Sequence, residues 1–245
     1  VDPDLGRHPH VLRLLAGGAE PWPQATMREM ATPMLLAQVL DRVQAEVVDA
    51  SRHGMNLALQ GGPGTGKTQA IAHVLGNAIQ DGRTVLFLSG RASAFRAAAV
   101  RLAETGFAAR CLPVYGAECV PDRLAVSLGV EPGQTVVETL SRLESRPAIV
   151  MATPASYAMH VPAAWAFDLL VVDEASLVPL ADGLPAIAAC DQVVICGDSH
   201  QMEKDPPLWQ LFGLDRPYVP QPSLIDAAVA ANMPVMTLTH HYRAR

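Results

Sequence analysis

Short, almost wholly apolar runs alternate with stretches of helical spacing along most of this chain. We expect the apolar runs to form strands, at residues 56–60, 84–88, 109–114, 148–151, 168–172, 192–196 and 235–238. We expect helices before and between them, at residues 34–50, 67–80, 92–104, 135–144, 180–188 and 223–231. Strands that are apolar on both faces are typical of a parallel sheet covered by helices on both sides. The pattern therefore predicts an α/β fold with three layers around a mostly parallel sheet.

The remaining stretches lack this periodicity. Residues 1–33 contain five prolines and a Gly-Gly pair, which predicts an irregular linker or the tail of a preceding segment. We expect residues 117–133 and 203–221 to be surface excursions and residues 34–245 to form one domain. A chain of 245 residues, half of them apolar, is long enough to bury one large core.

Charge and cysteine content narrow the classes of function. The net charge of −6 excludes a uniformly basic surface, although a local basic groove for nucleic acid is compatible with it. The four cysteines lack CxxC spacing, so we expect buried free thiols in a reducing, cytoplasmic setting. No apolar run reaches the ~18 residues of a membrane span, and we expect no membrane partner.

A glycine-rich loop lies between the first predicted strand and the helix after it. It reads GGPGTGKT and satisfies the phosphate-loop pattern GxxxxGK(S/T). Glycines let backbone N–H groups approach phosphate oxygens, and the helix N-terminus adds a positive dipole. We expect Lys67 to be catalytic and to reach the β- and γ-phosphates of ATP, and the Thr68 hydroxyl to ligate Mg²⁺. The predicted nucleotide contacts are Gly61, Gly62, Pro63, Gly64, Thr65, Gly66, Lys67, Thr68 and Gln69.

Two more predicted strands end in polar side chains. Asp173 and Glu174 close the run DLLVVDEAS, and sites gather at the carboxyl edge of parallel strands. We expect Asp173 to hold Mg²⁺ through bound water and Glu174 to be the base that activates the attacking water. Gln201, in VVICGDSHQM, is expected to sense the γ-phosphate and that water. Without the glycine loop, Asp173 and Glu174 could equally be a solvent-exposed acidic pair with no catalytic role.

The motifs QGGPGTGKT, VVDEAS, GDSHQ and LTHHYRAR together resemble those of superfamily 1 helicases. Their order and spacing look most like the Upf-like branch, above all its large bacterial members, and the resemblance covers about residues 34–245. RecD-like helicases share the glycine loop and the DEAS motif, so the branch stays open. The resemblance implies a RecA-like P-loop NTPase fold. It also implies the N-terminal motor domain of a DNA or RNA helicase or translocase that uses ATP and Mg²⁺.

The same resemblance assigns further residues. LDRVQ, at residues 40–44, is similar to the family's glutamine motif, which implies that Gln44 reads the adenine edge. Tyr242 matches the tyrosine that packs against the base, and Arg243 matches the catalytic arginine that reaches the γ-phosphate. Single-stranded DNA or RNA is expected to contact two loops at the strand ends, through Ser89, Gly90, Arg91, Thr153 and Pro154.

Members of this family close two RecA-like domains over one ATP. The sequence ends at Arg245, directly after the motif that contains Tyr242, and we expect a second RecA-like domain of the same polypeptide to lie beyond it. A nucleotide-dependent switch or scaffold without unwinding activity is the alternative function. Glu174 and Gln201 favour the motor, because a pure binder has no need of a water-activating base.

Overall fold

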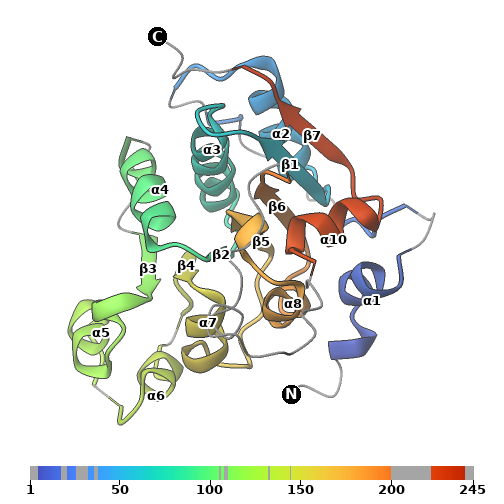
Figure 1. Ribbon diagram of the computed structural model, residues 1–245. Helices are drawn as coiled ribbons and strands as arrows, with labels where there is room; N and C mark the ends of the chain where they lie inside the picture. The colour runs from blue at the N-terminus through green and yellow to red at the C-terminus, as the bar shows by residue number, and fades with distance from the viewer. Residues whose placement is uncertain are drawn as a thin grey trace, which may run out of the picture.

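The computed structural model describes residues 5–17, 21–25, 33–35, 38–104, 106–107, 110–131, 133–143, 145–199 and 222–240. Within these residues the strands form one sheet in which every neighbouring pair is parallel (Figure 1). The strands are β1 Leu57–Gly61, β2 Val85–Ser89, β3 Cys111–Val114, β4 Ile149–Ala152, β5 Leu169–Asp173, β6 Val193–Gly197 and β7 Val235–Leu238. All seven runs expected to be strands are therefore strands, and their carboxyl ends lie along one edge of the sheet.

The strand order decides which strand ends meet. It is β3-β4-β2-β5-β6-β1-β7, so β6 lies between β1, which enters the glycine loop, and β5, which ends in Asp173. In register, Leu59 lies beside Cys196, and Ser89 lies beside Asp173. The carboxyl ends of β1, β6, β5 and β2 consequently form one continuous edge.

Side chains of the strands alternate between two apolar layers. In β2, Val85 and Phe87 belong to one buried cluster, and Leu86 and Leu88 belong to the other. The first cluster is covered by α2 Arg42–Arg52, α3 Lys67–Gln80 and α4 Ala92–Glu104. The second is covered by α1 Pro9–Ala16, α5 Pro121–Leu128, α6 Val136–Ser141, α7 Pro154–His160, α8 Leu180–Ala188 and α10 Leu224–Ala230. The predicted three-layer arrangement is confirmed (Figure 1).

Two helices, α1 and α5, lie where the pattern predicted irregular structure or a surface excursion, and α7 lies where it predicted no element. Helix α1 falls within residues 1–33, and its Val11 and Leu14 are buried in the second cluster. Trp22 follows it into the same core, where Nε1 donates to the Ala231 carbonyl oxygen over 2.9 Å. Helices α1, α5 and α7 all begin at a proline, whose fixed φ suits the first helical position. In the sequence, proline at these positions also fits a loop, whereas in the structure it begins a helix. The domain boundary predicted at residue 33 stays a prediction.

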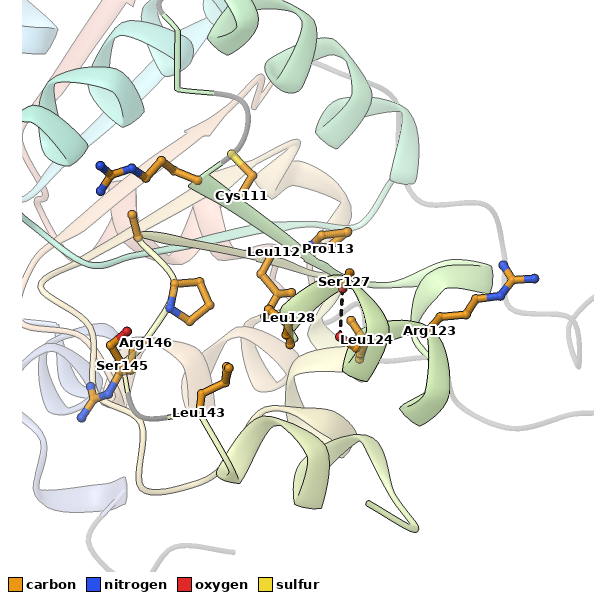
Figure 2. A pocket seen from close by; sticks show the side chains of 13 residues that line it. Cys111, Leu112, Pro113, Arg123, Leu124, Ser127, Leu128, Leu143, Ser145 and Arg146 are labelled. Carbon is orange, nitrogen blue, oxygen red and sulfur yellow. Dashed lines mark hydrogen bonds between the residues drawn. The ribbon is translucent and has the colours of Figure 1, made fainter. Parts of the chain in front are cut away.

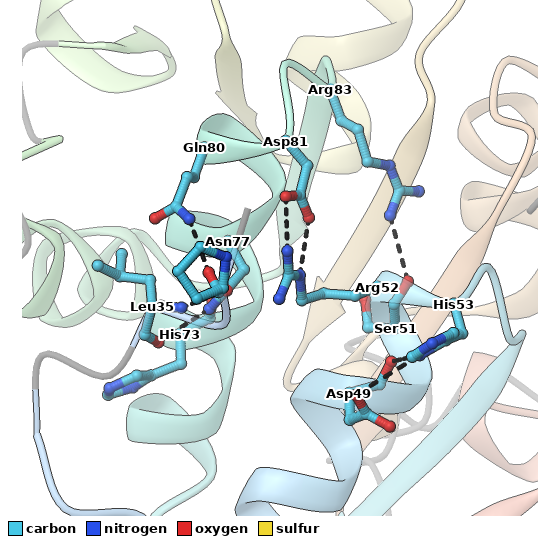
Figure 3. Close-up of polar contacts among 11 residues, drawn as sticks. Leu35, Asp49, Ser51, Arg52, His53, His73, Asn77, Gln80, Asp81 and Arg83 are labelled. Atoms are coloured by element: carbon cyan, nitrogen blue, oxygen red, sulfur yellow. Dashed lines mark hydrogen bonds and ion pairs between the residues drawn. The ribbon is translucent and has the colours of Figure 1, made fainter. Parts of the chain in front are cut away.

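A buried polar cluster holds α2 against α3 and the start of β2 (Figure 3). Arg52 forms a bidentate ion pair with Asp81, the C-cap of α3, through two N–O distances of 2.8 Å. Arg83 donates to the Ser51 carbonyl oxygen over 3.2 Å and to the Gln192 side chain. Bidentate arginine pairs fix geometry as well as charge. The carboxyl end of α3 is thereby anchored, while its amino end closes the glycine loop.

The four cysteines are free thiols. Cys190 and Cys196 are buried as expected, but Cys111 and Cys119 are only half-buried. Cys111 begins the edge strand β3, which has a neighbouring strand on one side only, and burial raises the pKa of its thiol to about 11. Among the helices that the structure describes, none has the length and hydrophobicity needed to cross a membrane.

Candidate nucleotide-binding site

The loop between β1 and α3 is shaped by its glycines. Gly64 has a φ of 82° and Gly66, the N-cap of α3, has a φ of 87°, values that side-chain-bearing residues rarely adopt. A Cβ on Gly61 would lie 2.6 Å from Oγ1 of Thr65. That hydroxyl donates to the Gly62 carbonyl oxygen over 2.8 Å. The loop is closed on itself at the amino end of α3, the geometry in which backbone N–H groups bind phosphate oxygens.

Lys67 is the first residue of α3, and its ammonium bends back over the loop. Its Nζ donates to the Gly62 carbonyl oxygen over 3.2 Å and to that of Gly61. The side chain of Gln69 points elsewhere, because its Nε2 donates over 3.0 Å to a backbone carbonyl oxygen in the segment before α2. Lys67 therefore lies over the glycine loop, and its contact with phosphates stays a prediction. A nucleotide contact through the Gln69 side chain requires that side chain's bond to break.

Asp173 is the last residue of β5 and is only 5% exposed. Burial raises the pKa of its carboxyl to about 6, although the backbone N–H of Glu174, 2.8 Å from Oδ1, and the charge of Lys67 act to lower it. The charges of Asp173 and Lys67 also both influence the pKa of Cys196, which lies on the intervening strand β6. Lys67 and Asp173 thus lie at the same edge of the sheet, near enough for their charges to interact, and a cation would stabilise the charged form of the carboxyl.

Glu174 adopts a left-handed backbone with a φ of 52°, which costs a non-glycine residue about 1–3 kcal/mol. The following turn, η4 Ala175–Leu177, packs against the end of β6. A Cβ on Gly197 would lie 3.3 Å from the backbone nitrogens of Ala175 and Ser176, so the glycine permits this approach. The surrounding fold thus sets the direction in which Glu174 leaves the strand.

Sequence reasoning missed Gln60. Its Nε2 donates to the Ser199 hydroxyl over 3.1 Å, which joins the strand entering the glycine loop to the loop that follows β6. Gln60 pairs in register with Gly197, so the two segments leave the sheet side by side. The pattern of the sequence held no signal for this contact, because the partners lie far apart along the chain.

Gln44 is fully buried, and its side chain is bound at both ends. It belongs to a capping box in which Asp41 Oδ1 accepts from Gln44 N over 2.7 Å and Gln44 Oε1 accepts from Asp41 N over 3.0 Å. The helix expected over residues 34–50 accordingly begins only at Arg42. Gln44 Nε2 donates to the Gly66 carbonyl oxygen over 3.3 Å. The side-chain amide of Gln44 therefore connects α2 to the glycine loop. Recognition of the adenine edge by Gln44 stays a prediction.

The two loops expected to contact nucleic acid lie at the same edge of the sheet as Asp173. Ser89 is fully buried, and its Oγ accepts from the backbone N–H of Arg91 over 3.2 Å. Gly90 and Arg91 are exposed. Thr153 caps α7 by accepting from Ser156 N over 3.1 Å. Exposed surface in the first loop therefore comes from Gly90 and Arg91, while the Ser89 hydroxyl shapes the turn. A role of either loop in binding nucleic acid stays a prediction.

Three expected site residues, Gln201, Tyr242 and Arg243, lie outside the described residues. Their roles therefore stay predictions from the resemblance.

A family model described as AAA domain matches residues 39–204. The UvsW helicase from bacteriophage T4 aligns with a TM-score of 0.53 at 10% identity, over 88% of this chain and 63% of that protein. The Pif1 helicase from Candida albicans aligns with a TM-score of 0.42 at 15% identity, over 84% of this chain and 41% of that protein. This chain spans less than two thirds of either structure, and identities this low show a shared fold alone. No curated protein sequence matches it.

Proposed function

The chain belongs to the AAA domain family, and from this premise we propose that it is an ATP-hydrolysing motor domain of a DNA or RNA helicase or translocase. We place it in superfamily 1, in the Upf-like branch, on the motifs of its sequence. The observation that carries the proposal is that the glycine loop with Lys67 and the buried carboxyl of Asp173, with Glu174 directly after it, lie at the carboxyl edge of one parallel sheet. A glycine loop alone would serve a nucleotide binder. A buried carboxyl of perturbed pKa beside a strained acidic residue supports catalysis.

The residues of the loop fit a nucleoside triphosphate with its magnesium ion. Gly61 has no Cβ to collide with the Thr65 hydroxyl, so the loop can turn tightly at the amino end of α3, where Lys67 lies. The buried carboxyl of Asp173 and the half-buried hydroxyl of Thr68 are hard oxygen groups of the kind that Mg²⁺ prefers. When bound, Mg²⁺ would neutralise charge that develops on the phosphates.

In this proposal each residue of the site has its own role in binding or hydrolysis. The Lys67 ammonium stabilises negative charge on the γ-phosphoryl group, and the Glu174 carboxylate takes a proton from water placed for in-line attack. A general base of this kind contributes roughly 10²–10⁴-fold to the rate. Gln201 orients the water, and Arg243 stabilises the transferred group. Gln44 and Tyr242 hold the adenine.

We further propose that single-stranded nucleic acid crosses the strand ends at Gly90 and Arg91 and at Thr153 and Pro154. These contacts are to the sugar–phosphate backbone, because a translocating motor must tolerate any sequence. The net charge of −6 confines the attraction to local positions such as Arg91. A second RecA-like domain supplies the other half of the track, and the cytoplasm is the proposed setting.

The test is ATP turnover by the whole polypeptide that carries these residues, with and without a single-stranded oligonucleotide. We expect turnover that requires Mg²⁺, rises with the oligonucleotide and is abolished by Lys67→Ala. Arg91→Ala should reduce the stimulation and leave basal turnover intact. Arg96→Ala, which removes another exposed arginine nearby on α4, is the matched control. Turnover that is indifferent to nucleic acid would support a nucleotide-dependent switch or scaffold instead.

A further inference from the structure

A cavity of about 470 Å³ opens at the edge of the sheet farthest from β7, between β3, α5 and the segment that enters β4. Cys111, the first residue of β3, and Ala148, directly before β4, both line it. It therefore lies toward the amino ends of these strands, whereas the nucleotide site and the loops at Arg91 and Thr153 lie at the carboxyl ends. A ligand in this cavity would leave the catalytic edge uncovered.

The floor of the cavity is aliphatic. Leu112 and Leu124 are buried there, and Leu128 and Leu143 are half-buried. Figure 2 shows Leu112, Leu124 and Leu128 close together in the hollow. The half-buried leucines leave apolar surface in contact with water at the opening. An apolar side chain of a ligand could cover this surface, and its burial would stabilise the complex.

The rim of the cavity is positively charged. Arg110, Arg123 and Arg146 line it and are exposed, and none of the described residues that line it is acidic. In Figure 2 the guanidinium groups of Arg123 and Arg146 lie on opposite sides of the leucines. This is a local departure in a chain that has 24 acidic and 18 basic residues. The Arg123 side chain points away from the leucines in Figure 2, so carboxylates brought to this rim would meet Arg110 and Arg146.

Two of these arginines are held in place by backbone carbonyl oxygens. Arg146 Nη1 donates to the carbonyl oxygen of Ala166, and Arg123 Nη1 donates to that of Ala117 over 3.3 Å. A carbonyl oxygen orients the Arg146 guanidinium group without neutralising its charge, and other N–H groups of that fork can still donate. Arginine held in this way loses less side-chain freedom when it binds a carboxylate.

We propose that this cavity docks an acidic peptide segment of a partner protein, with one apolar side chain on the leucine floor and carboxylates beside Arg110 and Arg146. An apolar centre with a polar, arginine-rich rim is the composition of protein–protein interfaces. Single-stranded nucleic acid fits less well, since no aromatic side chain among the described lining residues offers a base a stacking surface. The proposal does not depend on the proposed ATPase activity.

The experiment selects a phage-displayed random dodecapeptide library on the intact 245-residue chain. Enriched peptides are then synthesised with a fluorescent label, and their affinity is measured by polarisation. We expect them to combine Asp or Glu with Leu, Ile or Phe. The double variant Arg110→Glu, Arg146→Glu should weaken their binding by about tenfold or more, because it reverses charges that face the peptide. Arg96→Glu, the same charge change on α4, should leave their binding unchanged.

A second variant tests the floor without altering charge. Ser127 lines the cavity from the exposed side of α5, and Ser127→Trp should fill it and weaken the same peptides as strongly. Thermal melts monitored by circular dichroism establish that each variant is folded. The proposal is overturned if no acidic–apolar peptide is enriched, or if the enriched peptides bind both variants as well as the native chain. It is equally overturned if a labelled single-stranded oligonucleotide, rather than a peptide, loses binding in the double variant.

Discussion

Gln44 donates a hydrogen bond of 3.3 Å from its side-chain amide to the carbonyl oxygen of Gly66, and it has no exposed surface. The same amide accepts a bond from the backbone of Asp41, the N-cap of α2. One side chain thus ties the start of α2 to the residue that closes the glycine loop. The position of that loop depends on α2 as well as on its own glycines.

We expect Gln44→Ala to lower the free energy of unfolding by about 1–2 kcal/mol, because it breaks the capping box and the bond to Gly66. Urea denaturation measures this loss. Gln80→Ala is the control, since it removes one amide–carbonyl bond at the surface end of α3 and should cost less. If Gln44 also reads adenine, the ratio of ATP to GTP affinity falls in the variant. An equal loss for both nucleotides would mean that Gln44 acts through the loop alone.

The buried carboxyl of Asp173 should lower the free energy of unfolding at neutral pH when no Mg²⁺ or nucleotide is bound. Its folded-state pKa of about 6 lies above the ordinary value of 3.8, so its favourable contribution to stability is present below pH 3.8 and is lost as the pH rises through 6. We therefore expect Asp173→Asn to raise the free energy of unfolding at pH 7.5, without Mg²⁺, by on the order of 2–3 kcal/mol. The same change should abolish ATP turnover. Denaturation at pH 7.5 and pH 4 checks the cause: an equal gain at both would contradict it.

The bond between Gln60 and Ser199 should couple the glycine loop to the loop after β6. We expect Gln60→Ala and Ser199→Ala each to lower kcat about fivefold, the value of one neutral hydrogen bond, with little change in ATP affinity. Because both changes remove the same bond, the double variant should be no slower than either single variant. Steady-state turnover of the native chain, the two single variants and the double variant gives the coupling free energy between the two side chains. If the losses in kcat of the single variants multiply in the double variant, the bond does not couple the two loops.

Docking of α1 should depend on pH. The ring centroids of His8 and His10 lie 5.2 Å apart, and His10 is 4% exposed. Burial lowers the pKa of both, and the charge of Asp191 only partly opposes this. A lowered folded-state pKa means that the stability is present above the ordinary value of 6.5 and is lost as the pH falls through the folded value.

We accordingly expect the free energy of unfolding to fall between pH 7.5 and pH 5.5, and to fall less in a variant with His8→Gln and His10→Gln. Urea denaturation at the two pH values measures both proteins. An identical fall in the variant would assign the pH dependence to other groups.

The inner strands could be predicted from sequence because they are buried on both faces and are therefore continuous apolar runs, as in the Leu169–Val172 part of β5. The edge strands β3 and β7 are mostly apolar runs too, although both are partly exposed. Helix α1 could not be predicted, because eight residues give little periodic signal and its stability comes from packing of Val11, Leu14 and the nearby Trp22. Pro9, which begins that helix, reads equally well as a loop residue from the sequence.

The glycine loop and the carboxylates at 173 and 174 could be predicted because each is a contiguous motif whose spacing carries the chemistry. The contacts that place them could not. Gln60 and Ser199 are 139 positions apart, and Gln44 and Gly66 are 22 apart. The sequence also gave no indication that β6 lies between β1 and β5, since strand order is decided by packing and not by periodicity.

The central claim is that Lys67 holds the triphosphate while Glu174 drives its hydrolysis. Equilibrium binding of ATP with Mg²⁺ and single-turnover hydrolysis, measured on the native chain, Lys67→Ala and Glu174→Gln, test it most directly. We predict that Lys67→Ala loses both binding and hydrolysis. Glu174→Gln should bind ATP as the native chain does while hydrolysis falls by roughly 10²–10⁴-fold, the contribution of a general base. Equal loss of binding in the two variants, or undiminished hydrolysis in Glu174→Gln, would contradict the account.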